Sequence, residues 1–155
     1  MRIHLIAMGN RMPEWIQAGF FEYAKRMPKE CRLALKEIPL KKRDKHTDTQ
    51  RLIEQEGKQM LAAIPPRSRI IALDKDGHQW TTEQLSQQLS CWLQSGLDLA
   101  LLIGGPEGLA PACLQHAQDK WSLSKMTFPH PLVRIIVAEQ LYRAWSLLQG
   151  HPYHR

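Results

Sequence analysis

The chain has 155 residues, 43% of them hydrophobic, which is enough for one compact domain with a sizeable core but too short for two ordinary ones. Its 21 lysine and arginine residues against 15 acidic residues give a formal net charge of +6, which favours an anionic partner, nucleic acid above all. The three cysteines lie far apart and indicate neither a disulfide framework nor a zinc site. No apolar run is long enough for a signal peptide or a membrane span, so we expect a soluble cytoplasmic protein.

Strand and helix signals alternate in the first quarter of the chain. Residues 2–7 alternate polar and apolar side chains and then become apolar up to Gly9, which predicts a strand. Pro13 opens a helix to about Met27, whose apolar side chains recur at three- and four-residue steps and are expected in the core. They are Trp15, Ile16, Phe20, Tyr23 and Ala24. Residues 32–38 alternate apolar and polar side chains, which predicts a second, more exposed strand.

A strongly basic segment follows the second strand. Four of the five residues from 41 to 45 are lysine or arginine, which predicts a charged, mobile loop. Two interpretations stay open, a solvated loop without a partner and a contact with the phosphate backbone of a nucleic acid. Thr47 with Gln50 predicts a capping box at the start of the next helix. The buried side of that helix comprises Leu52, Ile53, Met60 and Leu61.

The middle of the chain repeats this alternation. Pro65 and Pro66 end the helix, residues 69–73 predict a third strand, and residues 74–77 predict a turn after it. Thr81 with Gln84 predicts a second capping box, at the start of a helix with an apolar inner side. That side comprises Leu85, Leu89 and Trp92.

The stretch from Leu99 to Gly108 is the centre of the expected fold. Residues 99–103 are all apolar and predict a strand buried on both faces, with three glycines and a proline directly after it. Gly104 and Gly105 lack the β-carbons that would keep a ligand from the backbone, so the sequence predicts a binding turn at the carboxyl end of the strand. A plain tight turn is the alternative. Neither the dinucleotide fingerprint nor the P-loop pattern is present, which argues against a nucleoside triphosphate.

The last third of the chain predicts a short helix over residues 109–119, a short strand over 121–124 and a loop over 125–131. A helix from about Leu132 to Gln149 follows. Its apolar arc is wider than packing on one sheet face requires, which predicts a partner surface and a homodimer. Strands that alternate with helices predict an α/β fold, a mainly parallel sheet covered by helices on both faces.

Two segments together resemble a known family. They read Leu-Ile-Gly-Gly-Pro-Glu-Gly at 102–108 and Trp-Ser-Leu-Ser at 121–124, followed by Thr-Phe-Pro-His-Pro-Leu-Val-Arg at 127–134. They resemble the SPOUT class of α/β-knot RNA methyltransferases. The Tyr-Arg-Ala-Trp segment at 142–145, the tail His-Pro-Tyr-His-Arg at 151–155 and the short length are most similar to its smallest members. These are the ribosomal RNA large-subunit methyltransferase H family, which methylates N3 of a pseudouridine in 23S ribosomal RNA.

The resemblance covers essentially the whole chain and implies a trefoil knot in its C-terminal half, within a single domain over residues 1–155. It implies S-adenosylmethionine as the cofactor, held at three sites that each follow a predicted strand. The implied cofactor residues are Leu73, Gly104, Leu123, Ser124, Lys125, Met126, Thr127 and Phe128. Apolar side chains and backbone hydrogen bonds there suit an adenine. We expect no metal, because His151 and His154 lack further ligands nearby.

An imide nitrogen must lose its proton before or as it accepts a methyl group, so a base or a solvent path is needed. The candidate catalytic residues are Tyr153, His154 and Arg155 in the tail and Glu139 and Tyr142 on the last helix, with His130, Arg134 and Arg143 as further candidates. Structural alternatives exist for several of them. His130 can cap the helix, Glu139 can pair with Arg143 at i, i+4, and an exposed tail is usually disordered.

The expected function is therefore methylation of 23S ribosomal RNA in assembled ribosomes by a homodimer, in which the tail of one subunit completes the pocket of the other. Two alternatives stay open. One is a basic RNA-binding or ribosome-assembly module without catalysis, which would have no reason to bring the cofactor residues together. The other is a knotted methyltransferase that acts on transfer RNA. The lack of an added RNA-binding domain argues against it, because so small an enzyme must rely on a structured substrate.

Overall fold

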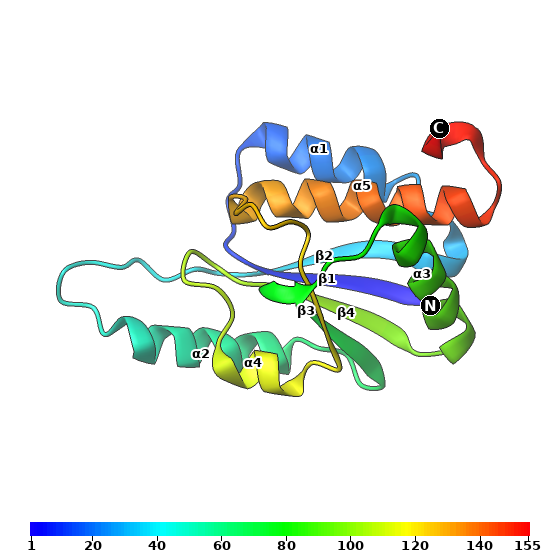
Figure 1. Cartoon of the computed structure of the whole chain (residues 1–155). Coiled ribbons are helices and arrows are strands. Elements are labelled where there is room, and N and C mark those ends of the chain that lie inside the picture. Colours follow the sequence, from blue (N-terminus) through cyan, green and yellow to red (C-terminus); the bar gives the residue numbers. More distant parts are fainter.

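The computed structural model describes residues 1–155 as a five-stranded sheet with helices on both faces (Figure 1). The strands are β1 (Arg2–Met8), β2 (Arg32–Ile38), β3 (Ser68–His78), β4 (Asp98–Ile103) and β5 (Asp119–Trp121). The helices are α1 (Glu14–Ala24), α2 (Thr49–Ala62), α3 (Thr82–Ser95), α4 (Pro111–His116) and α5 (His130–Leu148), with 3₁₀ helices η1 (Lys29–Cys31) and η2 (Pro152–His154). All neighbouring strands are parallel, in the order β2-β1-β4-β3-β5. The predicted α/β class is confirmed, while the trefoil knot stays a prediction.

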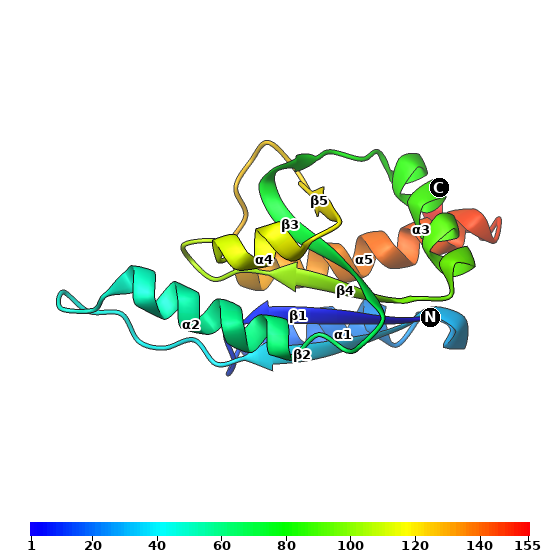
Figure 2. The same ribbon diagram turned by 90° about the horizontal axis from the view of Figure 1, so that it is seen from below.

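The sheet builds one core on each face, because successive side chains of a strand point in opposite directions. On β1, Leu5 packs among residues of α1, α3 and α5, whereas its neighbour Ile6 packs with residues of α2 and α4. On β4, Leu101 and Leu102 divide in the same way. Figure 2 shows α2 and α4 in front of the sheet and α1 and α5 behind it. Burial on both faces is the reason why residues 99–103 contain no polar side chain.

Helix α1 covers part of the wide apolar arc of α5. Ala138 and Tyr142 of this arc are buried in the same core as Phe20 of α1. A Cβ on Gly19 would lie 2.7 Å from Cδ1 of Ile135, so this glycine lets α1 approach α5 closely. Packing on α1 therefore accounts for part of the arc, while Leu132 and Ile135 stay half-buried. The homodimer stays a prediction.

The two predicted capping boxes have different outcomes. At α3 the box is confirmed, with the Thr81 hydroxyl accepting from the Gln84 backbone N–H and the Gln84 side chain accepting from that of Thr81. At α2 the prediction is wrong. Asp48 is the N-cap and accepts from the Arg51 backbone N–H. The Thr47 hydroxyl accepts from the Asp44 backbone N–H and donates to the Asp44 carboxylate. It is therefore not available to the helix, and Asp48 caps α2 instead.

The predicted turn over residues 74–77 is also wrong, because β3 continues through it to His78. Both Leu73 and His78 pair with Trp121, so the four residues between them bulge out of the ladder. A Cβ on Gly77 would lie 2.6 Å from the carbonyl carbon of Lys120, which shows how closely β5 approaches there. The strand predicted over 121–124 accordingly ends at Trp121.

Not all of the aromatic residues of α1 belong to the core. Phe20 is buried as predicted, but the Trp15 side chain, expected in the core, is 62% exposed. Trp15 precedes Phe20 by five positions, about 140° around the helix. It therefore lies on a different side of α1 from Ile16 and Phe20, which are both buried.

We predict that Gly57→Ala destabilises the protein although alanine favours a helix. The new Cβ would lie 2.5 Å from Cβ of Ala110, and overpacking of about 1–3 kcal/mol outweighs a helix-propensity gain of about 1 kcal/mol. The midpoint of urea unfolding should therefore fall. The double variant Gly57→Ala/Ala110→Gly moves the methyl group across the contact and should recover most of the loss. A higher midpoint for Gly57→Ala alone would contradict this view of the packing.

Candidate cofactor pocket and C-terminal tail

A pocket opens beside the bulge in β3 and the carboxyl ends of β4 and β5, where the loops after β4 and β5 meet the first turn of α5. All eight residues expected to contact a cofactor line it, although they come from three segments of the chain. They are Leu73, Gly104, Leu123, Ser124, Lys125, Met126, Thr127 and Phe128. The parallel sheet brings them together, because its strands all end at one edge.

The loop between β5 and α5 lines this pocket and contains backbone N–H groups that have no acceptor within the protein. Its shape comes from two serines, with the Ser122 hydroxyl donating to the Ser124 carbonyl and the Ser124 hydroxyl accepting from the Met126 backbone N–H, each at 3.0 Å. Five backbone N–H groups of the loop donate to no acceptor within the protein. They belong to Leu123, Ser124, Lys125, Thr127 and Phe128. Unpaired backbone donors beside apolar side chains suit a ligand with polar edges and a flat ring.

The structure gives a different reason for Gly104 than ligand approach. A Cβ on Gly104 would lie 2.6 Å from the backbone nitrogen of Leu109 and 2.7 Å from the carbonyl oxygen of Gly108. The turn itself therefore requires this glycine. Gly108 donates its backbone N–H to the Gly105 carbonyl at 3.0 Å and has φ +84°, a conformation that favours glycine. A substitution of Gly104 would therefore distort the turn itself, and a loss of ligand binding in such a variant would not show that the ligand contacts Gly104.

The start of α5 carries a charged side chain, Arg134, and an uncharged one, His130. Arg134 is 1% exposed and donates to the Glu37 carboxylate at 2.7 Å and to the carbonyls of Met8 and Gly9. This commitment makes it unavailable to a phosphate, contrary to one expectation. His130 lines the pocket, and burial, followed by the charge of Arg134, lowers its pKa. The imidazole is therefore uncharged at neutral pH.

The C-terminal tail is ordered and folds back on α5. The Tyr153 hydroxyl donates to Oε1 of Glu139 at 3.0 Å, and its ring packs edge-on against Tyr142 with the centroids 4.7 Å apart. The Arg143 guanidinium lies over the Tyr153 ring at 5.0 Å and pairs with Glu139 at 2.6 Å, as the i, i+4 spacing predicted. Burial and Glu139 raise the pKa of Tyr153 to about 12, so this phenol acts as a donor at neutral pH.

The structure does not bring the two sets of candidate residues together. None of Glu139, Tyr142, Tyr153, His154 and Arg155 lines the pocket. The pocket reaches only the first turn of α5, whereas the tail packs on its second half, and Figure 1 shows the C-terminus near the opposite end of that helix. The His154 Nδ1 is hydrogen-bonded to the His151 carbonyl, and Arg155 is exposed.

Sequence reasoning missed several lining residues. Three of them, Asp74, Ile103 and Ser122, directly precede or follow a predicted contact, and this position is the signal that could have found them. The others are Lys75, Gly108, Trp121 and Val133. No group of three or more histidine, cysteine, aspartate or glutamate side chains is arranged to hold a metal ion. The structure also contains no helix with the length and hydropathy needed to span a membrane.

The family model described as "Predicted SPOUT methyltransferase" matches residues 1–154. The chain belongs to the SPOUT methyltransferase family. Two relatives over the full length are proteins named Ribosomal RNA large subunit methyltransferase H. That of Thioalkalivibrio sulfidiphilus is 60% identical over 155 residues, covering 100% of this chain and 99% of the relative. That of Methylococcus capsulatus is 54% identical and covers both chains completely.

Solved structures share the fold at low sequence identity. A probable methylase family protein from Haemophilus influenzae superposes with a TM-score of 0.58 at 10% identity, over 99% of this chain and 70% of that one. Ribosomal RNA small subunit methyltransferase E from Neisseria gonorrhoeae, bound to S-adenosyl methionine, gives a TM-score of 0.50 at 9% identity, over 96% and 66%. At these identities the likeness supports the fold alone.

We predict that Tyr153 ionises at a higher pH than an ordinary tyrosine. Its pKa of about 12 in the folded chain exceeds the ordinary value of 10.0, so above about pH 10 the folded state keeps a proton that the unfolded state loses. The stabilisation from this group is complete below about pH 10 and is lost as the pH rises toward 12. Tyrosinate absorbance during alkaline titration should show a late step that Tyr153→Phe removes and Tyr23→Phe retains. A late step that survives in Tyr153→Phe would assign it to another tyrosine.

Proposed function

We propose that the protein is an S-adenosylmethionine-dependent methyltransferase that methylates N3 of a pseudouridine in 23S ribosomal RNA within assembled ribosomes. The observation that carries the proposal is the 60% identity over the full length with a relative named Ribosomal RNA large subunit methyltransferase H. The convergence of all eight expected cofactor residues on one pocket supports it independently. A binding module without catalysis would have no reason to keep these residues together.

The pocket fits the proposed cofactor. Leu73, Ile103, Leu123 and Phe128 supply apolar surface for the adenine, and the free backbone N–H groups of the loop over residues 123–128 supply hydrogen-bond donors. When bound, S-adenosylmethionine supplies a methyl group activated by a positively charged sulfur. The side chains that line the pocket orient the cofactor and exclude water from it.

In the proposal the active enzyme is a homodimer, and the pocket of one subunit is completed by the tail of a second copy. The separation of the tail from the pocket of its own chain supports this arrangement. Arg155 is exposed and available to pair with a phosphate, and Tyr153 would stack on an extruded base after leaving its contacts with Tyr142 and Arg143. Tyr153 is a poor proton acceptor because its pKa is raised, which leaves His154 as the tail residue best suited to accept the imide proton.

Ribosomal RNA is the proposed partner, and the net charge of +6 supports it. Lys41, Lys42 and Lys45 are exposed in the loop between β2 and α2 and are available to phosphates. Arg43 is not, because it pairs with Glu56 and Glu107. We further propose that residues 1–155 act as a single domain in the cytoplasm, where ribosomes are found.

We predict that Phe128→Ala weakens binding of S-adenosylmethionine about tenfold, because it removes half-buried apolar surface worth roughly 1.5 kcal/mol from the pocket. Isothermal titration calorimetry measures the dissociation constant directly. The matched control is Phe21→Ala, which removes a 63% exposed phenylalanine on α1 away from the pocket and should leave the affinity unchanged. Equal affinities for both variants would contradict the assignment of the pocket.

We predict that deletion of residues 151–155 abolishes methyl transfer to ribosomes while leaving cofactor affinity nearly intact, because the tail does not line the pocket of its own chain. Transfer of tritiated methyl groups to ribosomes measures the activity. Mixing the truncated chain with Phe128→Ala should restore part of it at low cofactor concentration, since one hybrid site then has both an intact pocket and a tail. Methylation at the normal rate by the truncated chain would remove Tyr153, His154 and Arg155 from the site.

A further inference from the structure

The basic segment between β2 and α2 contains one arginine that differs from its neighbours. Lys41, Lys42 and Lys45 are exposed, whereas the Arg43 side chain is only 18% exposed. A guanidinium carries five N–H donors, and the structure gives Arg43 five acceptor contacts. Two are to the Glu56 carboxylate, two are to the Glu107 carboxylate, and one, at 2.6 Å, is to the Lys41 carbonyl. Such saturation is typical of a structural clamp and not of a surface charge.

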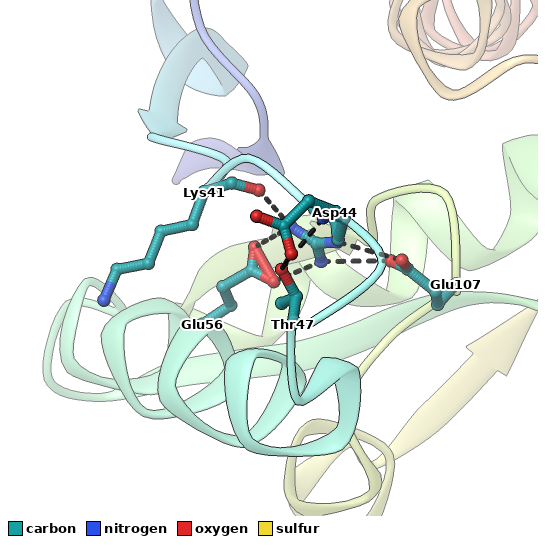
Figure 3. A network of polar contacts seen from close by, with 6 residues as sticks. Lys41, Asp44, Thr47, Glu56 and Glu107 are labelled. Carbon is teal, nitrogen blue, oxygen red and sulfur yellow. Dashed lines mark hydrogen bonds and ion pairs between the residues drawn. The ribbon is translucent and has the colours of Figure 1, made fainter.

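The two carboxylates come from different parts of the fold. Glu56 lies on α2 with its side chain 6% exposed, and Glu107 lies in the glycine loop, residues 104–108, after β4. In Figure 3 both reach the same guanidinium, close to the turn that Asp44 and Thr47 form. Arg43 therefore joins α2 to the glycine loop. It lies 13 positions before Glu56 and 64 positions before Glu107 in the sequence.

The glycine loop is also a wall of the cofactor pocket, to which Gly104, Gly105 and Gly108 contribute. Glu107 carries the only charged side chain of this loop, and both of its carboxylate oxygens accept from Arg43, at 2.9 and 3.0 Å. The guanidinium lowers the pKa of the Glu107 carboxyl, which keeps it ionised. Without the arginine, Glu107 and the buried Glu56 would face each other as unpaired carboxylates, and repulsion would drive the loop away from α2.

We propose that Arg43 is a positioning residue for the cofactor pocket, holding the glycine loop against α2 through Glu107 and Glu56. Arg43 itself does not line that pocket. The inference rests on the proposed function, because it takes S-adenosylmethionine as the ligand. It assigns to one residue of the basic segment a role in cofactor affinity instead of RNA binding.

The test compares three variants of the full chain by calorimetry with S-adenosylmethionine. Arg43→Met removes the charge, Arg43→Lys keeps the charge without the two-sided geometry, and Glu107→Gln breaks the link to the loop while retaining the pair of Arg43 with Glu56. Arg43→Met and Glu107→Gln should raise the dissociation constant about tenfold, the effect of losing charge-assisted hydrogen bonds. Arg43→Lys should recover only part of the affinity. Arg51→Met, an exposed arginine on α2, is the matched control and should bind normally.

Methyl-transfer kinetics separate positioning from a general structural defect. The KM for the cofactor should rise in Arg43→Met and Glu107→Gln, while kcat at saturating cofactor stays near that of the wild type. If Arg43→Met fails to fold, Glu107→Gln decides the question. Wild-type affinity in Glu107→Gln would overturn the role of Arg43 and leave the proposed function standing. A wild-type chain that binds no S-adenosylmethionine would instead contradict the proposed function itself.

Discussion

Every strand of the sheet runs in the same direction, and the arrangement of the site follows from this constraint. Parallel strands end at one edge, so the bulge of β3 and the loops after β4 and β5 meet there although they are widely separated in the sequence. The same constraint requires helical crossovers, which cover both faces and exclude polar side chains from the central strands. The two cores and the pocket are therefore consequences of one pairing pattern.

Helix α5 connects the pocket to the rest of the molecule. At its start, Arg134 fastens it to the carboxyl ends of β1 and β2, and His130 and Val133 form part of the pocket wall. Toward its end, Glu139 and Tyr142 hold the tail. A helix of 19 residues spans about 28 Å, so one rigid element keeps the two groups of candidate residues apart within the chain.

Local patterns predicted the parts of the fold that depend on neighbours in sequence. The strand over residues 32–38 and the capping box at Thr81 agree with the structure, because alternation and capping involve only a few adjacent residues. The bulge in β3 depends on pairing with β5 and gave no local signal. The clamp of Arg43 was missed for the same reason, since Glu107 is 64 positions away. The eight cofactor residues came from a family resemblance, and the edge of a parallel sheet explains why they meet.

The order of the tail has an entropic consequence. Fixing the backbone of one residue costs about 1–2 kcal/mol of conformational entropy, and a disordered segment must meet that cost when it binds. Here the hydrogen bond of Tyr153 with Glu139 and the packing against Tyr142 fix the tail while the chain folds. Any macromolecule that docks on residues 151–155 meets a surface already shaped, and little of the binding free energy is spent on ordering the tail.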